Sequence, residues 1–296
     1  MRTDRPSRTA EGAALLRASH GLLDDEPLLF EDHAVADLLS AGARMALRPL
    51  PPPLRRALRR RERLNPQRAA LRGQIVLRAR FAEDALEAAI ARGVDQILVL
   101  AAGLDTLAIR RPTLLENCAL YEVDHPATQA WKRRRLGARG AGIRFVPVDF
   151  GRDDLAVALR QAGLDPQRPL FVTWLGCTYY LERVAITATL AALAQVAAPG
   201  SRIALDYWTQ QAPSGWGSRA LLAGIRFAVA LQQEPMVGLL TPAGLGRLAG
   251  NTGWRVAEDL DAQAQRQRWL RGRRDTLAVP DFAHLAILEH AGDPGR

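Results

Sequence analysis

Short apolar runs alternate with segments of helical spacing through the middle of the chain. The runs predict strands at QILVL, ALYEV, IRFVPV, LFVTW and RIALDYW, and helices lie between them, the longest over Glu182 to Ala198. Two further strands, WRVAEDL and FAHLAILEH, follow late in the chain. Apolar strands that alternate with helices are typical of a parallel sheet covered on both faces. The pattern therefore predicts an α/β fold with a doubly wound, seven-stranded sheet.

The first 74 residues lack this alternation. TAEGAALLRASH and LLFEDHAVADLL have helical spacing, and a proline run that we expect to forbid helix precedes a dense run of arginines. We therefore divide the chain into an N-terminal helical cap and crossover, residues 1–74, and a core domain, residues 75–296. The first helix of that core, around FAEDALEAAIARG, is expected to stop at Gly93.

The alternation pauses again after Trp208, the last residue of RIALDYW. Residues 209–250 contain the helical stretch GSRALLAGIRFAVALQQ and a second, short helix. Because Trp216 and Phe227 lie in this insertion, we expect it to form a helical lid over an apolar pocket for a small molecule.

Composition restricts the class of protein further. The chain has 296 residues, of which 48% are hydrophobic, enough for one large core, and no apolar run is long enough to cross a bilayer. We therefore expect a cytoplasmic protein with no membrane partner. Cys118 and Cys177 have no Cys or His at metal-ligand spacing, which predicts reduced thiols and no metal. His20 and His33 are expected to be ordinary polar surface residues.

The net charge of +9 comes almost wholly from arginine, because Lys132 is the only lysine. Such a bias can reflect the base composition of a gene. No aromatic residues interleave with the arginines of residues 55–63 to stack on bases, so a solvated charged face is favoured over a nucleic-acid arm.

The loop after QILVL contains one glycine, Gly103, preceded by Ala101 and Ala102. Ligands of doubly wound sheets bind beyond the carboxyl ends of the strands, where a glycine lets the backbone approach them. A pyrophosphate usually requires two or three glycines, so this loop favours a ligand without phosphates over NAD. By itself, a glycine after a buried strand is more often only a turn residue.

Aspartates follow the next two strands. Asp124 lies 21 residues after Gly103, at a strand end where a carboxylate can accept both hydroxyls of a ribose. Asp149 follows the third strand, at the adenine end of such a site. Each aspartate could instead cap a helix or a turn. Their positions at successive strand ends favour a nucleoside site.

These elements, AGLDT and EVDHP above all, together with WLGCTYYL and APGSRIALDYW, resemble the leucine carboxyl methyltransferase-like group of class I S-adenosylmethionine-dependent methyltransferases. This group includes bacterial enzymes that act on natural products. The resemblance covers nearly the whole chain. Five parallel strands and a late pair also fit the Rossmann-like sheet of such enzymes better than a six-stranded dehydrogenase sheet. The resemblance implies S-adenosyl-L-methionine as cofactor.

Carried over by position, the resemblance implies a role for several residues. Arg78 would reach the methionine carboxylate of the cofactor, and Gly103 would line the methionine side. Asp124 would bind the ribose, and Asp149 with Phe150 would hold the adenine.

Two cofactor positions depart from the family pattern. Ala101 replaces a glycine, which narrows the loop by one methyl group. Leu175 replaces an acid often found before the glycine of the fourth-strand motif, and it could pack against the adenosine instead. Arg80 is the neighbouring alternative to Arg78.

The acceptor would be oriented by other side chains. Tyr179 and Tyr180 follow the fourth strand, and Tyr180 matches a tyrosine of the family motif. Arg17 lies on the N-terminal helix, which in the family folds over the pocket, and it could pair with an anionic acceptor. Asp206 is a candidate base, although a cap or a salt bridge is favoured. Cys177 has no identifiable histidine partner that would make it a nucleophile.

Three classes of function remain open on the sequence alone. The favoured one is an O-methyltransferase that acts by in-line displacement on a carboxylate or hydroxyl of a small, aromatic or polyketide-like molecule. A protein or nucleic-acid methyltransferase is the second, although WLGCTYY lacks the Asp/Asn-Pro-Pro-aromatic signature of many nucleic-acid enzymes. The third is a protein that binds the cofactor without catalysis.

Overall fold

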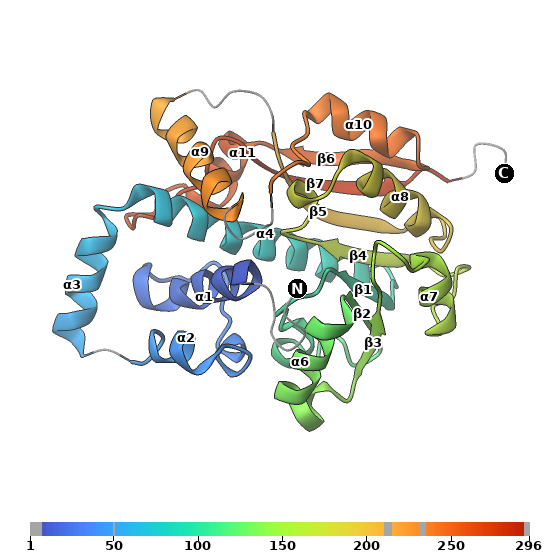
Figure 1. The fold of residues 1–296 in the computed structure, drawn as a ribbon, viewed down its shortest axis with the longest axis horizontal. Helices are drawn as coiled ribbons and strands as arrows, with labels where there is room; N and C mark the ends of the chain where they lie inside the picture. Colours follow the sequence, from blue (N-terminus) through green and yellow to red (C-terminus); the bar gives the residue numbers. More distant parts are fainter. Residues whose placement is uncertain (1–7, 50, 210–214, 231–234, 293–296) are drawn as a thin grey trace.

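A twisted seven-stranded sheet crosses the middle of the molecule in the computed structural model (Figure 1). The structure describes residues 8–49, 51–209, 215–230 and 235–292. Within them the strand order is β3-β2-β1-β4-β5-β7-β6. The strands are β1 (Gln96–Leu100), β2 (Ala119–Asp124), β3 (Ile143–Pro147), β4 (Leu170–Trp174), β5 (Arg202–Trp208), β6 (Trp254–Leu260) and β7 (Ala283–His290).

The sheet confirms the predicted fold class. Strands β1 to β5 are parallel, and β7 lies antiparallel between β5 and β6. Every residue of β1 and of β4 is buried, as expected for strands covered on both faces. The order of winding reverses between β1 and β4, which creates a crevice at their carboxyl ends.

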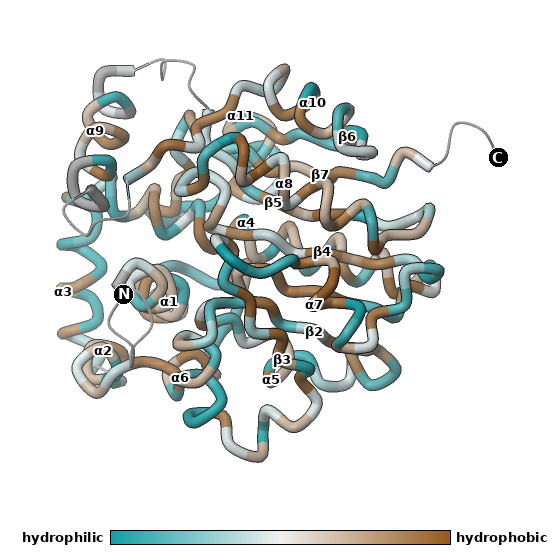
Figure 2. The backbone as a smooth tube through the Cα atoms, turned by 45° about the vertical axis from the view of Figure 1, so that its right-hand side comes forward, coloured by the Kyte–Doolittle hydropathy of each residue, from teal (hydrophilic) through white to brown (hydrophobic). Residues whose placement is uncertain are grey.

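Helices cover both faces of the sheet. Side chains alternate along β1, so that Ile97 and Val99 pack with α4, whereas Leu98 and Leu100 pack with α7 and α8. Figure 2 shows the hydrophobic segments gathered in the strands and in the helix faces against them. The helices are α1 (Arg8–Leu23), α2 (Ala41–Met45), α3 (Pro52–Glu62), α4 (Pro66–Ile90), α5 (Leu107–Arg110), α6 (Pro126–Leu136), α7 (Leu155–Gln161), α8 (Arg183–Ala194), α9 (Trp216–Ala230), α10 (Pro242–Gly250) and α11 (Ala262–Gln265), with short turns η1 (Ala34–Asp37), η2 (Gly137–Gly140), η3 (Thr178–Tyr180) and η4 (Arg266–Leu270).

Helix α6 is fastened to the sheet by the only lysine in the chain. Lys132 and Glu122 of β2 are both buried, and Lys132 Nζ lies 2.6 Å from Glu122 Oε2.

Several expected helix boundaries are wrong. The proline run does not forbid helix, because α3 begins at Pro52, where the missing N–H would have no helical partner anyway. Helix α8 ends at Ala194 and not at Ala198, which precedes Pro199 and is therefore disfavoured in a helix. LLFEDHAVADLL forms only the turn η1.

The division of the chain into two parts stays a prediction. Helix α4 runs without interruption through the proposed boundary between residues 74 and 75. Within the predicted lid, α10 packs on β6 and α8. The side chains of Trp216 and Phe227 lie outside the described residues, as do residues 210–214 and 231–234.

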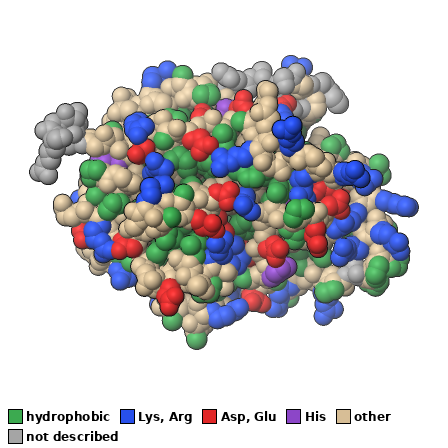
Figure 3. Space-filling view, turned by 180° about the vertical axis from the view of Figure 1, so that it is seen from behind, with side chains coloured by type: hydrophobic (Ala, Val, Ile, Leu, Met, Phe, Trp, Pro, Cys, Tyr) green, Lys and Arg blue, Asp and Glu red, His purple; other side chains and the backbone are tan. Residues whose placement is uncertain are grey.

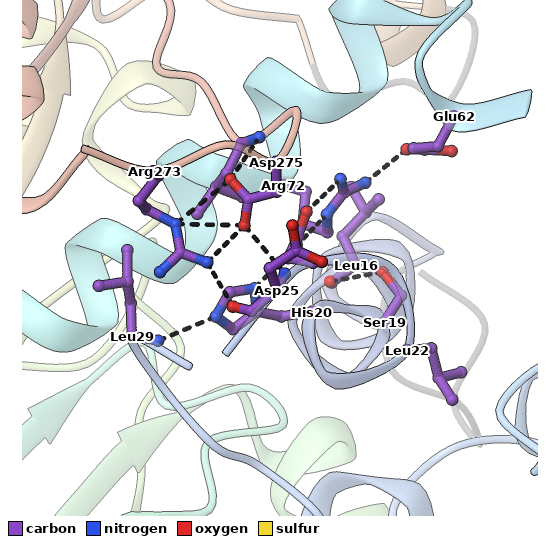
Figure 4. Close-up of polar contacts among 12 residues, drawn as sticks. Leu16, Ser19, His20, Leu22, Asp25, Leu29, Glu62, Arg72, Arg273 and Asp275 are labelled. Carbon is purple, nitrogen blue, oxygen red and sulfur yellow. Dashed lines mark hydrogen bonds and ion pairs between the residues drawn. The ribbon is translucent and has the colours of Figure 1, made fainter. Parts of the chain in front are cut away.

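A fully buried ion pair joins the N-terminal helices to the core (Figure 4). Arg72 of α4 donates from Nε and Nη2 to the two carboxylate oxygens of Asp24, at 2.7 and 2.8 Å. Its Nη1 donates to Glu62 at the end of α3. Burial alone would raise the pKa of Asp24, but hydrogen bonds from His20 and Arg72 lower it. One arginine therefore fixes α1, α3 and α4 relative to one another.

His20 is part of this cluster, and its expected place on the surface is wrong. Its side chain is fully buried, and Leu29 N donates to Nε2 at 3.1 Å. The Nδ1 atom must then carry the hydrogen, which points to Asp24 Oδ2 at 2.8 Å. His33 is exposed, as predicted.

A segment late in the chain also contacts this cluster. Arg273 donates to the carbonyl oxygens of Asp25 and Pro27, at 2.6 and 2.8 Å, and Asp275 accepts from Asp25 N at 3.0 Å (Figure 4). The arginine-rich segment RWLRGRRD therefore has a structural role, because it fixes the loop that follows α1.

We expect Arg72→Met to lower the free energy of unfolding by about 3–5 kcal/mol, because it leaves the Asp24 carboxylate buried without its cation. Denaturant unfolding measures the loss. The control is Arg68→Met on the same helix, whose side chain is half exposed and which should change stability by less than about 0.5 kcal/mol. Equal stability of the two variants would show that the buried pair does not fix the cap.

Candidate functional site

A cavity of about 750 Å³ lies where the parallel strands end. The loops after β1, β2 and β4 and the end of β5 line it on one side, and α1 and α4 line it on the other. This is the crevice at the reversal of winding between β1 and β4, and its volume suits a small ligand.

The loop after β1 turns through two residues in the left-handed region. Gly103 has φ of +47°, and Ala101 has φ of +54°. An alanine costs roughly 1–2 kcal/mol in this conformation, whereas a glycine adopts it freely. The glycine that the family pattern has at this position is therefore explained by the backbone of the loop.

Asp124 holds this loop in place from the end of β2. Its Oδ2 accepts from Gly103 N at 2.6 Å, and its Oδ1 accepts from His125 N at 2.7 Å. His125, and not Asp124, caps α6, because His125 Nδ1 accepts from Ala127 N. Burial raises the pKa of Asp124, although the two backbone hydrogen bonds oppose the shift. Thr128 is a further hydrogen-bond partner of this carboxylate, which still keeps some capacity to accept from a ligand.

Arg78 of α4 reaches into the cavity, whereas Arg80 does not line it. Arg78 Nη1 donates to Tyr179 Oη at 2.9 Å and lies 3.3 Å from Asp206 Oδ2. Its guanidinium lies over Gly176, where an added Cβ would come within 2.6 Å of Nη2. Burial alone would lower the pKa of Arg78, but Tyr179 and Asp206 raise it. Arg78 is therefore a fixed, permanently charged group.

Asp206 and Cys177 lie at the same end of the sheet. Asp206 is fully buried and accepts from Gln74 Nε2 at 2.8 Å and from Gly176 N at 2.5 Å in addition to its ion pair with Arg78. The salt bridge favoured from the sequence is thus present. Burial raises the pKa of the Cys177 thiol to about 12, which keeps it protonated at neutral pH.

An aromatic row runs along this wall of the cavity. The rings of Tyr179 and Tyr180 are 4.7 Å apart, Tyr179 and Trp208 are 4.6 Å apart, and Trp208 and Phe282 are 4.7 Å apart. Burial raises the pKa of Tyr179 well above its usual range, so its phenol stays neutral. The buried Nε1–H of Trp208 has no hydrogen-bond partner among the described residues.

Arg17 of α1 also lines the cavity but is not solvated, contrary to the usual state of an arginine on a surface helix. Its Nε donates to Asp32 Oδ2 at 2.7 Å, and its Nη2 donates to Leu104 O at 2.8 Å. Thr106 donates to the same Asp32 oxygen at 2.7 Å. Arg17 therefore fastens α1 to the loop after β1.

Most of the predicted site residues meet at this one cavity. They are Arg17, Arg78, Ala101, Gly103, Asp124, Leu175, Tyr179 and Tyr180. Asp149 and Phe150 are not among its lining residues. The Asp149 carboxylate accepts from Gly151 N at 3.1 Å, as a turn cap does, and Phe150 is 46% exposed. Their contact with adenine stays a prediction.

Sequence reasoning missed the wall formed by α4. Its lining residues recur at helical spacing, and this pattern is visible in the sequence. The domain boundary proposed after residue 74 split the pattern between two parts of the chain. They are Leu71, Gln74, Ile75, Arg78, Ala79, Ala82, Glu83 and Leu86.

None of the helices in the described part of the chain is long and apolar enough to span a bilayer. The same holds for metal sites: the described residues lack a suitable set of ligands. They contain no group of three or more His, Cys, Asp and Glu side chains that could hold a metal ion.

Comparison with known proteins identifies several relatives of this chain. The family model for leucine carboxyl methyltransferase matches residues 10–194. YktD of Bacillus subtilis, provisionally named an S-adenosyl-L-methionine-dependent methyltransferase, is 26% identical over 300 residues, which cover 96% of this chain and 98% of YktD. A Streptomyces coelicolor protein with the same provisional name is 36% identical over 203 residues, 67% of each chain.

Solved structures with the same fold include two bacterial proteins. A duf574 family protein from Streptomyces avermitilis covers 96% of this chain and 98% of its own, and a provisionally named methyltransferase from Thermobifida fusca covers 97% and 95%. Each has a TM-score of 0.58 and 15% sequence identity with this chain. At this identity the likeness shows a shared fold.

We expect Ala101→Gly to raise the free energy of unfolding by up to about 1 kcal/mol, because glycine relieves the left-handed strain and loses somewhat more chain entropy on folding. Thermal and denaturant unfolding measure the gain. Ala91→Gly, at φ of −60°, is the control and should lower stability by about 0.5–1 kcal/mol. A loss of stability in both variants would contradict the assigned strain.

Proposed function

Because this chain belongs to the leucine carboxyl methyltransferase family and is an S-adenosylmethionine-dependent methyltransferase, we propose that it methylates a carboxylate oxygen of a small apolar acid. One observation carries the choice of acceptor. Where β4 and β5 end, Tyr179 and Cys177 are held protonated, and the buried carboxylate of Asp206 is engaged by Gln74, Gly176 and Arg78 and does not line the cavity. A carboxylate acceptor needs no base, because it is already a nucleophile at neutral pH.

The residues of the cavity fit the cofactor. Arg78 is a buried cation whose described hydrogen bonds use only Nη1, so Nε and Nη2 remain to bind the methionine carboxylate. Asp124 lines the cavity and keeps capacity to accept from a ribose hydroxyl beside its bonds to Gly103, His125 and Thr128, and Leu175 offers an apolar surface for the adenosine. We extend the adenine end of the site to Asp149 and Phe150, just beyond the cavity.

S-adenosylmethionine, when bound, supplies a methyl group on a positively charged sulfur, and this group passes to the acceptor oxygen by in-line displacement. The chain's own residues would align the acceptor. Tyr179 accepts from Arg78 and keeps its hydroxyl hydrogen for the acceptor. Tyr180 completes this wall. The rest of the acceptor, an aromatic or polyketide-like acid, would lie against the apolar part of the lining.

Helix α1 would exclude water from the reaction. Ala13, Leu16 and Arg17 of this helix face the cavity, and Arg17 holds the helix to the loop after β1. A dry site strengthens the hydrogen bonds to the acceptor oxygen and prevents loss of the methyl group to water. Arg17 is already paired with Asp32. An anionic acceptor that bound Arg17 would therefore have to share its guanidinium with the Asp32 carboxylate.

We expect Asp124→Asn to weaken binding of S-adenosylmethionine and of its demethylated product by about 10- to 150-fold, the usual effect of one charged hydrogen bond. Calorimetric titration measures both. The control is Asp37→Asn, a partly exposed carboxylate paired with Arg139, which should bind both ligands as the wild type does. Unchanged binding by Asp124→Asn would remove Asp124 from the site.

The cofactor affinity measured by this titration should depend on pH, and the raised pKa of Asp124 determines the direction of the change. The pKa of Asp124 is raised, and the ionised form accepts the ribose hydroxyls, so affinity should be full above that pKa and fall as pH drops through it. The fall should begin at a higher pH than an ordinary aspartate, with a pKa of about 3.9, would give. Asp124→Asn should lack this step.

We expect apolar aromatic acids to yield methyl esters and their matching alcohols and phenols to yield no product. Transfer of a labelled methyl group measures the reaction, and release of methanol by alkali identifies an ester. Asp124→Asn, assayed at a cofactor concentration that saturates only the wild type, provides the control with reduced transfer. Preferential methylation of the phenols would show that the cavity contains a base and would overturn the proposed acceptor.

A further inference from the structure

The positive charge of this protein is concentrated in one short segment. Residues 44–68 contain nine arginines and one glutamate, a net charge of +8 out of the chain's +9. The other parts of the chain are together almost neutral. A general arginine bias of the gene would have spread the charge, so this segment needs an explanation of its own. A field of a single sign attracts partners of the opposite sign.

Helix α3 carries much of this charge at the edge of the molecule (Figure 1). It packs on α1 and α4, and Arg59 fixes it there by donating to Leu22 O at 3.1 Å and to Asp25 Oδ1 at 2.8 Å. Figure 2 draws the helix mostly in the hydrophilic colour, and in the view from behind basic side chains crowd the corresponding edge (Figure 3).

Seven arginines of this segment are exposed, and together we call them the arginine face. No side chain in it makes an ion pair with a described residue, so its charges are not neutralised within the described part of the chain. Its members are Arg44, Arg48, Arg55, Arg56, Arg60, Arg61 and Arg63.

Exposed apolar side chains lie among these arginines. Met45 is 66% exposed, Leu54 is 56% exposed and Leu64 is 84% exposed. They are three of the seven large hydrophobic side chains that the described residues expose. Leaving them in water is unfavourable, and a purely electrostatic partner would not remove that cost.

The combination of arginines and aliphatic side chains distinguishes between anionic partners. A single-stranded nucleic acid is typically held by aromatic side chains that stack on bases, and residues 44–68 contain no Phe, Tyr or Trp. A bilayer surface offers both phosphates for arginines and an acyl boundary for aliphatic side chains.

The sequence expectation of no membrane partner rested on the lack of a spanning segment, which does not bear on binding at a bilayer surface. We propose that the arginine face, with Met45, Leu54 and Leu64, docks this protein reversibly on the surface of an anionic phospholipid bilayer. The guanidinium groups would bind lipid phosphates, and the aliphatic side chains would enter the boundary between headgroups and acyl chains. This inference does not depend on which acceptor the cavity binds.

The test is co-sedimentation of the full chain with vesicles of phosphatidylcholine alone or of equimolar phosphatidylcholine and phosphatidylglycerol. We expect binding only to the anionic vesicles, and salt should weaken it because it screens the charges. A variant with four arginines of the face changed should bind at least about tenfold more weakly, since each basic residue near such a surface contributes about fivefold. The changes are Arg55→Gln, Arg56→Gln, Arg60→Gln and Arg61→Gln.

A second variant removes the same net charge elsewhere. It replaces exposed arginines that make no ion pair with a described residue, and it should bind the vesicles within about twofold of the wild type. Equal thermal midpoints for the two variants would show that both are folded. The control changes are Arg92→Gln, Arg134→Gln, Arg247→Gln and Arg271→Gln.

A further variant separates the apolar part of the surface from the charge. Leu54→Ser with Leu64→Ser should also weaken vesicle binding, whereas an effect of net charge alone would leave it unchanged. Three results would overturn the proposal: no binding to anionic vesicles, equal losses in the two arginine variants, or displacement from vesicles by RNA with tighter binding to RNA. The last result would assign the arginine face to a nucleic acid.

Discussion

The buried pair of Arg72 and Asp24 determines where the N-terminal helices of this protein lie. A guanidinium and a carboxylate that are both removed from water are tolerated only when nearly all of their hydrogen bonds are made, so α1 and α4 have one acceptable relative position. Both helices line the cavity at the strand ends. The shape of the ligand site is therefore set by a polar contact that lies outside the site.

The site itself depends on backbone geometry at the strand ends. Gly103 and Ala101 turn the loop after β1 so that Asp124 can accept the Gly103 amide, and Gly176 leaves room for the Arg78 guanidinium. One anionic and one cationic group are thus fixed before any ligand arrives, and little reorganisation remains to be done on binding. The ends of β4 and β5 instead supply the neutral side chains of Tyr179 and Cys177 and the Asp206 carboxylate, which is already engaged by other groups. This arrangement suits an acceptor that is itself charged.

The sequence predicted the sheet well, because strands covered on both faces leave a clear apolar pattern, and it predicted the strand-end residues because parallel strands bring their carboxyl ends together. It could not predict features that depend on distant partners. His20 and Asp24 are spaced like an ordinary surface pair on a helix, and only the approach of Arg72 buries them. The lining residues of α4 were assigned to two different parts of the chain because the composition changes near residue 74, although the helix continues across that point.

Lys132 gives this protein an internal reporter that most proteins lack. It is the only lysine, it is buried, and it is held by Glu122 under α6. Reagents that modify lysine amines should leave the folded chain's side chains untouched and should label Lys132 only when α6 separates from β2. The rate of labelling therefore measures local opening of one helix at a single atom, next to the strand that ends in Asp124.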